Sequence, residues 1–338
     1  MPHKIEDDAR AVLLPAFADT TLSDPVCRFL ESGGVSILLG ESRAEYVARA
    51  MSPERRARET AETFRTVTQA ARARSGSLLA FVDVEMGGIN RLHDLVPGFP
   101  PADSLADTPP AEIEAIACAV ASRARDMGVN AFLAPIVDVL TGPNPWLAGR
   151  IWSADPARVG DLSAAYVRGV QKAGVAATIK HFPGFGHMTG DPAIEASATN
   201  VMSRADLERS WTSFSAPIAA DAAMVMVGPA VVAALDPERA ALRSAQVVGL
   251  LRNAFGFAGL VMADDLDAAA TLRGDSVAQA AIEALLAGCD LLMLADIDNQ
   301  VEEVAQAIIA AVQSGQIAAT ALEASANRVR TVARRYEV

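Results

Sequence analysis

The sequence predicts an α/β fold in which eight parallel strands close into a (β/α)8 barrel of the TIM type, formed as a single domain by residues 1–338. Short apolar runs alternate along the chain with amphipathic segments whose apolar residues recur at helical spacing. The runs are continuous instead of alternating, which is typical of parallel strands buried on both faces. No linker or break in composition separates the units, so a closed barrel is favoured over an open, doubly wound sheet.

Eight apolar runs are expected to form the barrel strands: residues 12–14, 35–39, 78–84, 131–139, 176–179, 224–227, 259–263 and 291–294. The segments between them are expected to be helical, among them 110–128, 162–174, 245–256 and 301–315. Gly128, Gly174 and Gly288 stand just before a strand, where a helix commonly ends on glycine. The last segment, 321–338, is expected to be a helix that packs on the barrel wall.

The bulk composition excludes several classes of protein. The net charge of -12 disfavours a nucleic-acid partner, because binding to phosphates requires a basic face. No apolar run approaches the length that spans a bilayer, and the first residues show no signal-peptide pattern. We therefore expect a cytoplasmic protein without nucleic-acid or membrane partners, as a monomer or a homodimer.

The three cysteines, Cys27, Cys118 and Cys289, lie far apart in apolar text. An odd and scattered set does not suggest a disulfide framework or a metal cluster. We expect free, buried thiols in a reducing compartment.

Polar residues gather where the expected strands end. In barrels of this class the carboxyl ends of the strands carry the chemistry, so these side chains should face one pocket. A single charged residue at a strand end is often a helix N-cap, but five such strand ends together predict a site. The residues concerned are Asp83, Glu85, Asp138, Lys180, His181, Asp264, Asp265 and Asp296.

Three motifs carry a resemblance to a known family. They are Ile-Lys-His-Phe-Pro-Gly-Phe-Gly at 179–186, Asn-Ala-Phe-Leu-Ala-Pro-Ile-Val-Asp-Val at 130–139 and Gly-Leu-Val-Met-Ala-Asp-Asp-Leu-Asp at 259–267. In combination they resemble the single-domain family 3 β-N-acetylhexosaminidases of bacterial cell-wall recycling. The resemblance extends over nearly the whole chain, from the strand at 35–39 to the strand at 291–294.

The resemblance implies a role for each matching residue. Asp264 matches the catalytic nucleophile, which would form a covalent glycosyl-enzyme by the retaining route. Asp265 matches a companion acid with a structural role. The residues that match sugar-binding positions are Asp83, Arg91, Arg150, Lys180 and His181. No cofactor and no metal are implied.

The chain departs from the family's pattern at the acid/base. The position of the acid/base histidine is occupied by Ala193, and a second loop histidine is replaced by Phe185. General acid–base assistance is worth about 10²–10⁴-fold, so the change bears directly on activity. Asp191 is the first candidate for a substitute and His187 the second, with Glu195 as the weakest.

The sequence thus predicts a glycoside hydrolase-like protein that acts on a small β-linked hexosaminide, such as one of N-acetylglucosamine. Two alternatives stay open. One is a sugar-binding homologue with impaired catalysis. The other is a barrel enzyme with different chemistry, such as a Schiff-base aldolase that uses Lys180. A metal hydrolase is disfavoured, because the four histidines show no ligand spacing.

Overall fold

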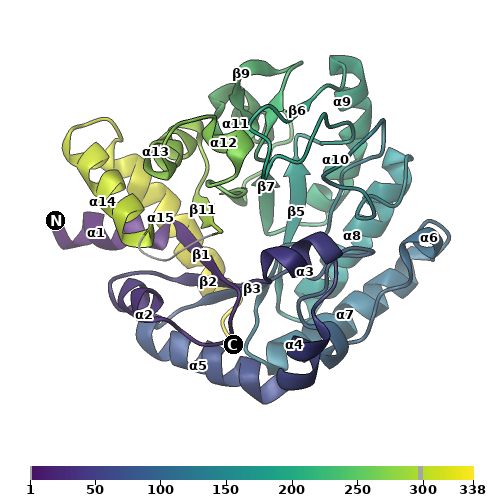
Figure 1. The fold of residues 1–338 in the computed structure, drawn as a ribbon, viewed down its shortest axis with the longest axis horizontal. Coiled ribbons are helices and arrows are strands. Elements are labelled where there is room, and N and C mark those ends of the chain that lie inside the picture. Colours follow the sequence, from purple (N-terminus) through teal and green to yellow (C-terminus); the bar gives the residue numbers. More distant parts are fainter. Residues whose placement is uncertain (1, 296–299) are drawn as a thin grey trace.

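The computed structural model describes residues 2–295 and 300–338, and its centre is a closed barrel of eight parallel strands (Figure 1). Their order around the barrel is β1-β11-β10-β7-β5-β4-β3-β2. The predicted α/β barrel is therefore confirmed. The strands are β1 (Leu13–Phe17), β2 (Ser36–Leu39), β3 (Leu79–Val82), β4 (Ala131–Phe132), β5 (Ala176–Phe182), β7 (Met224–Val227), β10 (Leu260–Ala263) and β11 (Leu291–Leu294).

Each predicted apolar run supplies one barrel strand, and the two runs at 224–227 and 291–294 have the predicted ends. β5 continues past its predicted end to Phe182, so Lys180 and His181 belong to the strand itself. β4 is much shorter than the predicted run 131–139. Pro135 has no backbone N–H to donate to a ladder, and the chain beyond β4 is held by single bonds such as Val137 N to Lys180 O at 2.7 Å.

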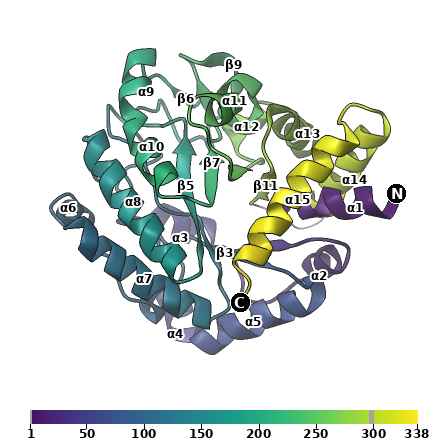
Figure 2. The same ribbon diagram turned by 180° about the vertical axis from the view of Figure 1, so that it is seen from behind.

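Helices surround the barrel, and Figures 1 and 2 show them from its two sides. They are α1 (Pro2–Ala11), α2 (Asp24–Glu31), α3 (Arg43–Ala48), α4 (Pro53–Arg58), α5 (Ala61–Ser75), α6 (Ala102–Leu105), α7 (Pro110–Asp126), α8 (Pro156–Lys172), α9 (Arg204–Ser210), α10 (Thr212–Ala219), α11 (Ala245–Asn253), α12 (Ala269–Leu272), α13 (Val277–Ala287), α14 (Gln300–Gln313) and α15 (Ala319–Arg335), with short 3-10 turns at His93–Leu95 and Ala241–Arg243. None of the described helices is long and apolar enough to cross a membrane.

A small sheet that the sequence did not predict lies outside the barrel. It consists of β6 (Thr199–Asn200), β8 (Val231–Val232) and β9 (Asp236–Ala240). Two of these strands have only two residues, too few to show any periodicity. A bridge from Met188 to Asn200 joins the loop after β5 to this sheet. The sheet thereby anchors the loop that carries the sequence's acid/base candidates.

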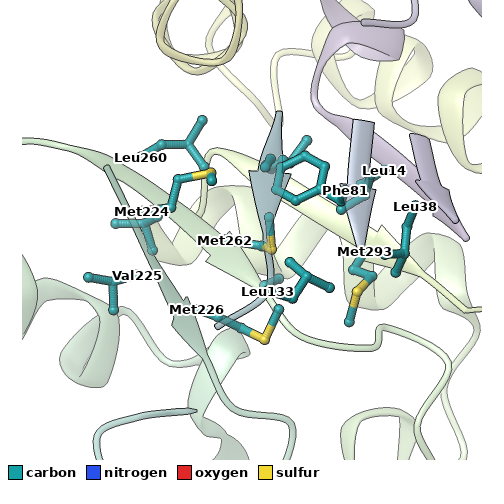
Figure 3. Packing of buried hydrophobic residues seen from close by; sticks show 14 of the residues in the cluster. Leu14, Leu38, Phe81, Leu133, Met224, Val225, Met226, Leu260, Met262 and Met293 are labelled. Atoms are coloured by element: carbon teal, nitrogen blue, oxygen red, sulfur yellow. The ribbon is translucent and has the colours of Figure 1, made fainter. Parts of the chain in front are cut away.

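The barrel interior is filled by side chains from many strands, as Figure 3 shows. Methionines of β7, β10 and β11 (Met226, Met262 and Met293) meet Leu133, which follows β4. All four are buried, and this explains why the strands carry continuous apolar runs. Met226, Leu133 and Met293 also line the pocket described below, so the core forms its floor.

The three predicted helix-terminal glycines, Gly128, Gly174 and Gly288, all have positive φ, at 81°, 78° and 108°. This conformation strains any residue with a Cβ.

The cysteine prediction is correct for Cys289, which is free and buried, but Cys27 and Cys118 are only half-buried free thiols.

We predict that Gly128→Ala destabilises the protein by roughly 1–3 kcal/mol. A Cβ at this position would lie 2.2 Å from Oγ1 of the buried Thr68, in addition to the strained backbone. Gly249→Ala is the matched control, since Gly249 lies within α11 and a Cβ there has no neighbour nearer than 3.6 Å. Urea unfolding should show a loss for the first variant and a gain of about 0.5–1 kcal/mol for the second. Equal urea midpoints of unfolding for the two variants would contradict the claim that Gly128 is needed for its positive φ and for the close approach of Thr68.

Candidate active site

A pocket of about 440 Å³ opens at the carboxyl ends of the barrel strands. Six residues that were predicted from strand ends or from the resemblance line it: Asp83, Arg150, Lys180, His181, Asp264 and Asp265. They come from β5 and from the segments that follow β3, β4 and β10. Asp296, also predicted at this rim, lies outside the described residues.

A buried network of ion pairs forms one wall of the pocket. Lys180 Nζ lies 2.7 Å from Asp83 Oδ1 and 2.9 Å from Glu85 Oε1. Arg150 binds Glu85 through two nitrogens, at 2.6 and 3.1 Å. Burial alone would raise the pKa of Glu85, but Arg150 and Lys180 hold it well below its usual range. Two cations and two carboxylates thus balance one another and fix the positions of these side chains.

His181 is oriented by a second buried carboxylate. Asp138 accepts hydrogen bonds from His181 Nδ1 at 2.7 Å and from two backbone N–H groups, of His181 and Phe185. Trp146 packs against the imidazole ring, with ring centroids 4.5 Å apart. Because Nδ1 is held by Asp138, Nε2 is directed toward the pocket and lies 4.0 Å from Asp264 Oδ2.

Asp264 presents an oxygen to the pocket that has no hydrogen-bond partner. It follows β10 directly, and its backbone N–H is fixed by Val227 O at 3.0 Å. Oδ1 accepts a bond from the N–H of Asp265 at 2.8 Å, whereas Oδ2 is buried without a partner among the described residues. The residue as a whole is only 6% exposed. Leaving a buried carboxylate oxygen unpaired is costly, which points to a ligand that would meet it.

The prediction that Arg91 binds a sugar hydroxyl is corrected by its position. Arg91 does not line the pocket and is fully buried behind it. Its guanidinium binds both oxygens of Glu59, at 2.6 and 3.0 Å, and the carbonyl of Gly40 at 2.6 Å. These bonds use its donors for internal structure. Arg91 therefore supports the segment that follows β2 and has no access to a ligand.

The two acid/base candidates from the loop after β5 also stay outside the pocket lining. Asp191 accepts a bond from the N–H of Ala193 at 2.9 Å. The ring of His187 lies against Gly142. The pocket is instead lined by residues that follow Asp191, namely Pro192, Ala193 and Ile194. The position matched to the acid/base histidine thus faces the pocket, while the proposed substitutes flank it.

The sequence analysis missed Glu41, which lines the pocket two residues after β2. Its Oε2 is buried without a hydrogen-bond partner among the described residues. Burial, together with the charges of Asp83 and Glu85, raises the pKa of Glu41 to about 8. The rule that polar residues at strand ends form the site would have found it, since Glu41 follows the strand as directly as Glu85 follows β3.

The pocket at the carboxyl ends of the strands holds one carboxylate oxygen without a partner among the described residues, Oδ2 of Asp264, beside the fixed Lys180–His181 pair. These features define a (β/α)8 barrel with a binding site for a polar small molecule. The Glycosyl hydrolase family 3 N terminal domain matches residues 35–332. The chain therefore belongs to glycosyl hydrolase family 3.

Its relatives are hexosaminidases. The beta-hexosaminidase of Xylella fastidiosa (strain 9a5c) is 35% identical over 225 residues, which are 64% of this chain and 67% of that protein. The beta-hexosaminidase of Stenotrophomonas maltophilia (strain K279a) is 34% identical over 227 residues, 64% of this chain and 66% of the relative. These homologues point to a glycosidase, with a glycoside as substrate.

Solved structures agree with the sequence relatives. The Beta-N-acetylhexosaminidase of Beutenbergia cavernae DSM 12333 superimposes with a TM-score of 0.84 at 27% identity and covers 98% of both chains. A glycoside hydrolase family 3 beta-N-acetylglucosaminidase of Paenibacillus sp. str. FPU-7 gives a TM-score of 0.87 at 26% identity. That alignment covers 98% of this chain, which spans 62% of the Paenibacillus chain.

Proposed function

We propose that the protein is a retaining glycosidase for small β-linked N-acetylhexosaminides, with Asp264 as the nucleophile. The observation that carries this proposal is the unpartnered Oδ2 of Asp264, held in the same pocket as Lys180 and His181. Oδ2 attacks the anomeric carbon while the bond to the leaving oxygen breaks, and water later hydrolyses the glycosyl-enzyme. The paired side chains of Asp83, Arg150, Lys180 and His181 position the sugar without having to reorganise.

For the proton transfer we place Asp191 first and His187 second. Both lie on the loop whose residues Pro192–Ile194 line the pocket, so a shift of this loop brings either side chain toward the glycosidic oxygen. A carboxyl group or an imidazole on this loop would protonate the leaving group and then activate water. Ala193, at the position matched to the family's histidine, has no group that can do this.

Two other functions were left open by the sequence. A Schiff-base lysine needs a depressed pKa. Burial lowers the pKa of Lys180, but the carboxylates of Asp83 and Glu85 outweigh this and raise it above its usual range. The aldolase is therefore disfavoured. A sugar-binding protein without turnover differs from a glycosidase only in activity, and the assay below separates the two.

The test follows hydrolysis of 4-nitrophenyl N-acetyl-β-D-glucosaminide by proton NMR. We expect the β-anomer of the free sugar to appear first, as a double displacement requires. Initial release of the α-anomer would exclude Asp264 as a nucleophile. Binding of N-acetylglucosamine without any turnover would support the sugar-binding protein instead.

The acid/base assignment is tested with Asp191→Ala and His187→Ala. The variant that lacks the true group should lose about 10²–10⁴-fold in kcat/KM on an unactivated disaccharide and much less on the 4-nitrophenyl glycoside, whose leaving group needs no proton. Azide should restore its turnover and give a glycosyl azide. The exposed Ser197→Ala is the control on the same loop. Full activity of both variants on the disaccharide would refute both assignments.

A further inference from the structure

One carboxyl group of the pocket has no part in the proposed reaction. Glu41 lines the pocket two residues after β2, and its Oε2 is buried without a hydrogen-bond partner among the described residues. The two cations that act on it are held elsewhere, since Arg91 binds Glu59 and Lys180 binds the carboxylates that follow β3. Leaving a buried polar atom without a partner is costly, so Oε2 indicates a contact that a ligand would supply.

Glu41 is mostly protonated at neutral pH. Burial and the charges of Asp83 and Glu85 raise its pKa to about 8. Lys180 and Arg91 act in the opposite direction but do not outweigh burial. The other ionisable side chains that line the pocket are those of Tyr46, Asp83, Arg150, Lys180, His181, Asp264, Asp265 and Asp267. A neutral carboxyl group offers a ligand an O–H donor beside a carbonyl acceptor.

A sugar hydroxyl group suits the two carboxyl groups that follow β2 and β3. These strands are neighbours in the barrel, and of the charged groups around Glu41, Asp83 acts on it most strongly. Asp83 Oδ1 is bound by Lys180, whereas Oδ2 accepts no hydrogen bond among the described residues. A hydroxyl group accepts a hydrogen bond from the O–H of Glu41 and donates its own to Asp83 Oδ2. An ammonium group has no acceptor, so it would leave the O–H of Glu41 unsatisfied.

The barrel order places Glu41 away from the reacting centre. Glu41 and Asp83 follow the neighbouring strands β2 and β3, whereas Asp264 follows β10. β1 and β11 separate β2 from β10 on one side of the barrel. In a pyranose, C4 lies across the ring from the anomeric carbon, and C6 is attached to the next carbon. A sugar whose anomeric carbon lies at Asp264 therefore turns the edge with C4 and C6 toward Glu41 and Asp83.

We propose that Glu41 is a specificity-determining residue that donates its carboxyl O–H to the hydroxyl group on C4 or C6 of the glycosyl unit, while Asp83 accepts a hydrogen bond from the same hydroxyl. The inference rests on the proposed function for the placement of the anomeric carbon. The pocket accordingly selects glycosides that carry this hydroxyl group over those that lack it.

The experiment compares 4-nitrophenyl N-acetyl-β-D-glucosaminide with its 4-deoxy and 6-deoxy analogues. At pH 7 we expect one analogue to fall below the parent in kcat/KM by roughly 10- to 100-fold. Glu41→Leu, which has no donor, should reduce this ratio by about tenfold, whereas Glu41→Gln, whose amide keeps an N–H donor, should retain most of it. The exposed Glu54→Leu in α4 is the matched control and should keep the ratio of the unmodified protein. Thermal unfolding establishes that each variant is folded.

The pH dependence separates this hydrogen bond from a structural role of Glu41. As the pH rises from 7 to 9.5, Glu41 loses its O–H, because its pKa is about 8. The ratio of the parent to the deoxy analogue should therefore fall toward the value of Glu41→Leu. In Glu41→Gln the ratio should stay constant, because an amide does not titrate. Titrations of other pocket groups that affect both substrates equally cancel in this ratio.

An unchanged ratio in Glu41→Leu would overturn the proposal. Equal pH profiles for Glu41→Gln and the unmodified protein would also overturn it, and this comparison decides even where Glu41→Leu does not fold. Calorimetry with the methyl β-glycosides separates the inference from hydrolysis. Weaker binding of a deoxy glycoside that depends on Glu41, without turnover of any substrate, would refute the glycosidase and leave this contact standing. Turnover with equal kcat/KM for the parent and both analogues would do the reverse.

Discussion

Asp264→Asn is expected to lower kcat on 4-nitrophenyl N-acetyl-β-D-glucosaminide by about 10⁴-fold or more, as for other enzymes that lose their nucleophile. An activated leaving group removes the need for a proton donor but not the need for a nucleophile. The loss should therefore be as large on this substrate as on a disaccharide, in contrast to the effect expected for an acid/base variant.

The stability of Asp264→Asn should change little. The asparagine retains the oxygen that accepts the N–H of Asp265, and the other oxygen has no partner among the described residues to lose. Asp103→Asn, at an exposed position of α6, is the control that should keep full activity. Residual turnover of a tenth or more, in a variant shown by mass spectrometry to be free of deamidation, would remove Asp264 from the mechanism.

Lys180→Met has the second large effect and acts mainly on stability. It leaves the buried carboxylates of Asp83 and Glu85 with one fewer cation, and breaking such a buried pair costs about 3–5 kcal/mol. Urea unfolding at neutral pH measures this loss. Lys172→Met, at an exposed position of α8, should stay within about 0.5 kcal/mol of the unmodified protein. A Lys180→Met variant as stable as this control would show that the network is not held together by charge.

The deficit of Lys180→Met should depend on pH. In the native protein the pKa of Glu85 lies below its usual range, so this carboxylate contributes stability at pH values above its unfolded pKa and loses it as the pH falls. Without Lys180, burial raises the pKa of a carboxyl group in the network, and protonation then relieves the uncompensated charge. The difference in unfolding free energy between the two proteins should therefore be smaller at pH 5 than at pH 8. A difference that grows on acidification would contradict this account.

Much of the architecture can be predicted from the sequence, because continuous apolar runs and terminal glycines act locally. The pocket follows from the same rule, since Lys180, His181 and Asp264 stand where strands end. The direction of a side chain does not follow from it. Arg91 turns away from the pocket because Glu59 binds its guanidinium. The two residues are far apart in the sequence, so no local pattern predicts that they form an ion pair.

The acid/base residue of the site could be predicted from the sequence only in part. A motif fixes the place of Ala193 along the chain, and the structure puts that place on the pocket wall. Whether Asp191 can reach the same point depends on loop geometry, which its bond to Ala193 N sets in the structure. Glu41 follows β2 closely enough for the strand-end rule to include it, and it was missed because it lies outside the three motifs that carry the family resemblance.

The central claim is that Asp264 becomes covalently bound to the sugar, and trapping that adduct tests it most directly. The protein is incubated with an activated 5-fluoro N-acetyl-β-hexosaminyl fluoride, which forms the glycosyl-enzyme faster than it is hydrolysed. Peptide mass spectrometry should find one sugar added, on the peptide that contains Asp264. A protein that hydrolyses the 4-nitrophenyl glycoside but carries the label on another residue, or carries none, would contradict the account.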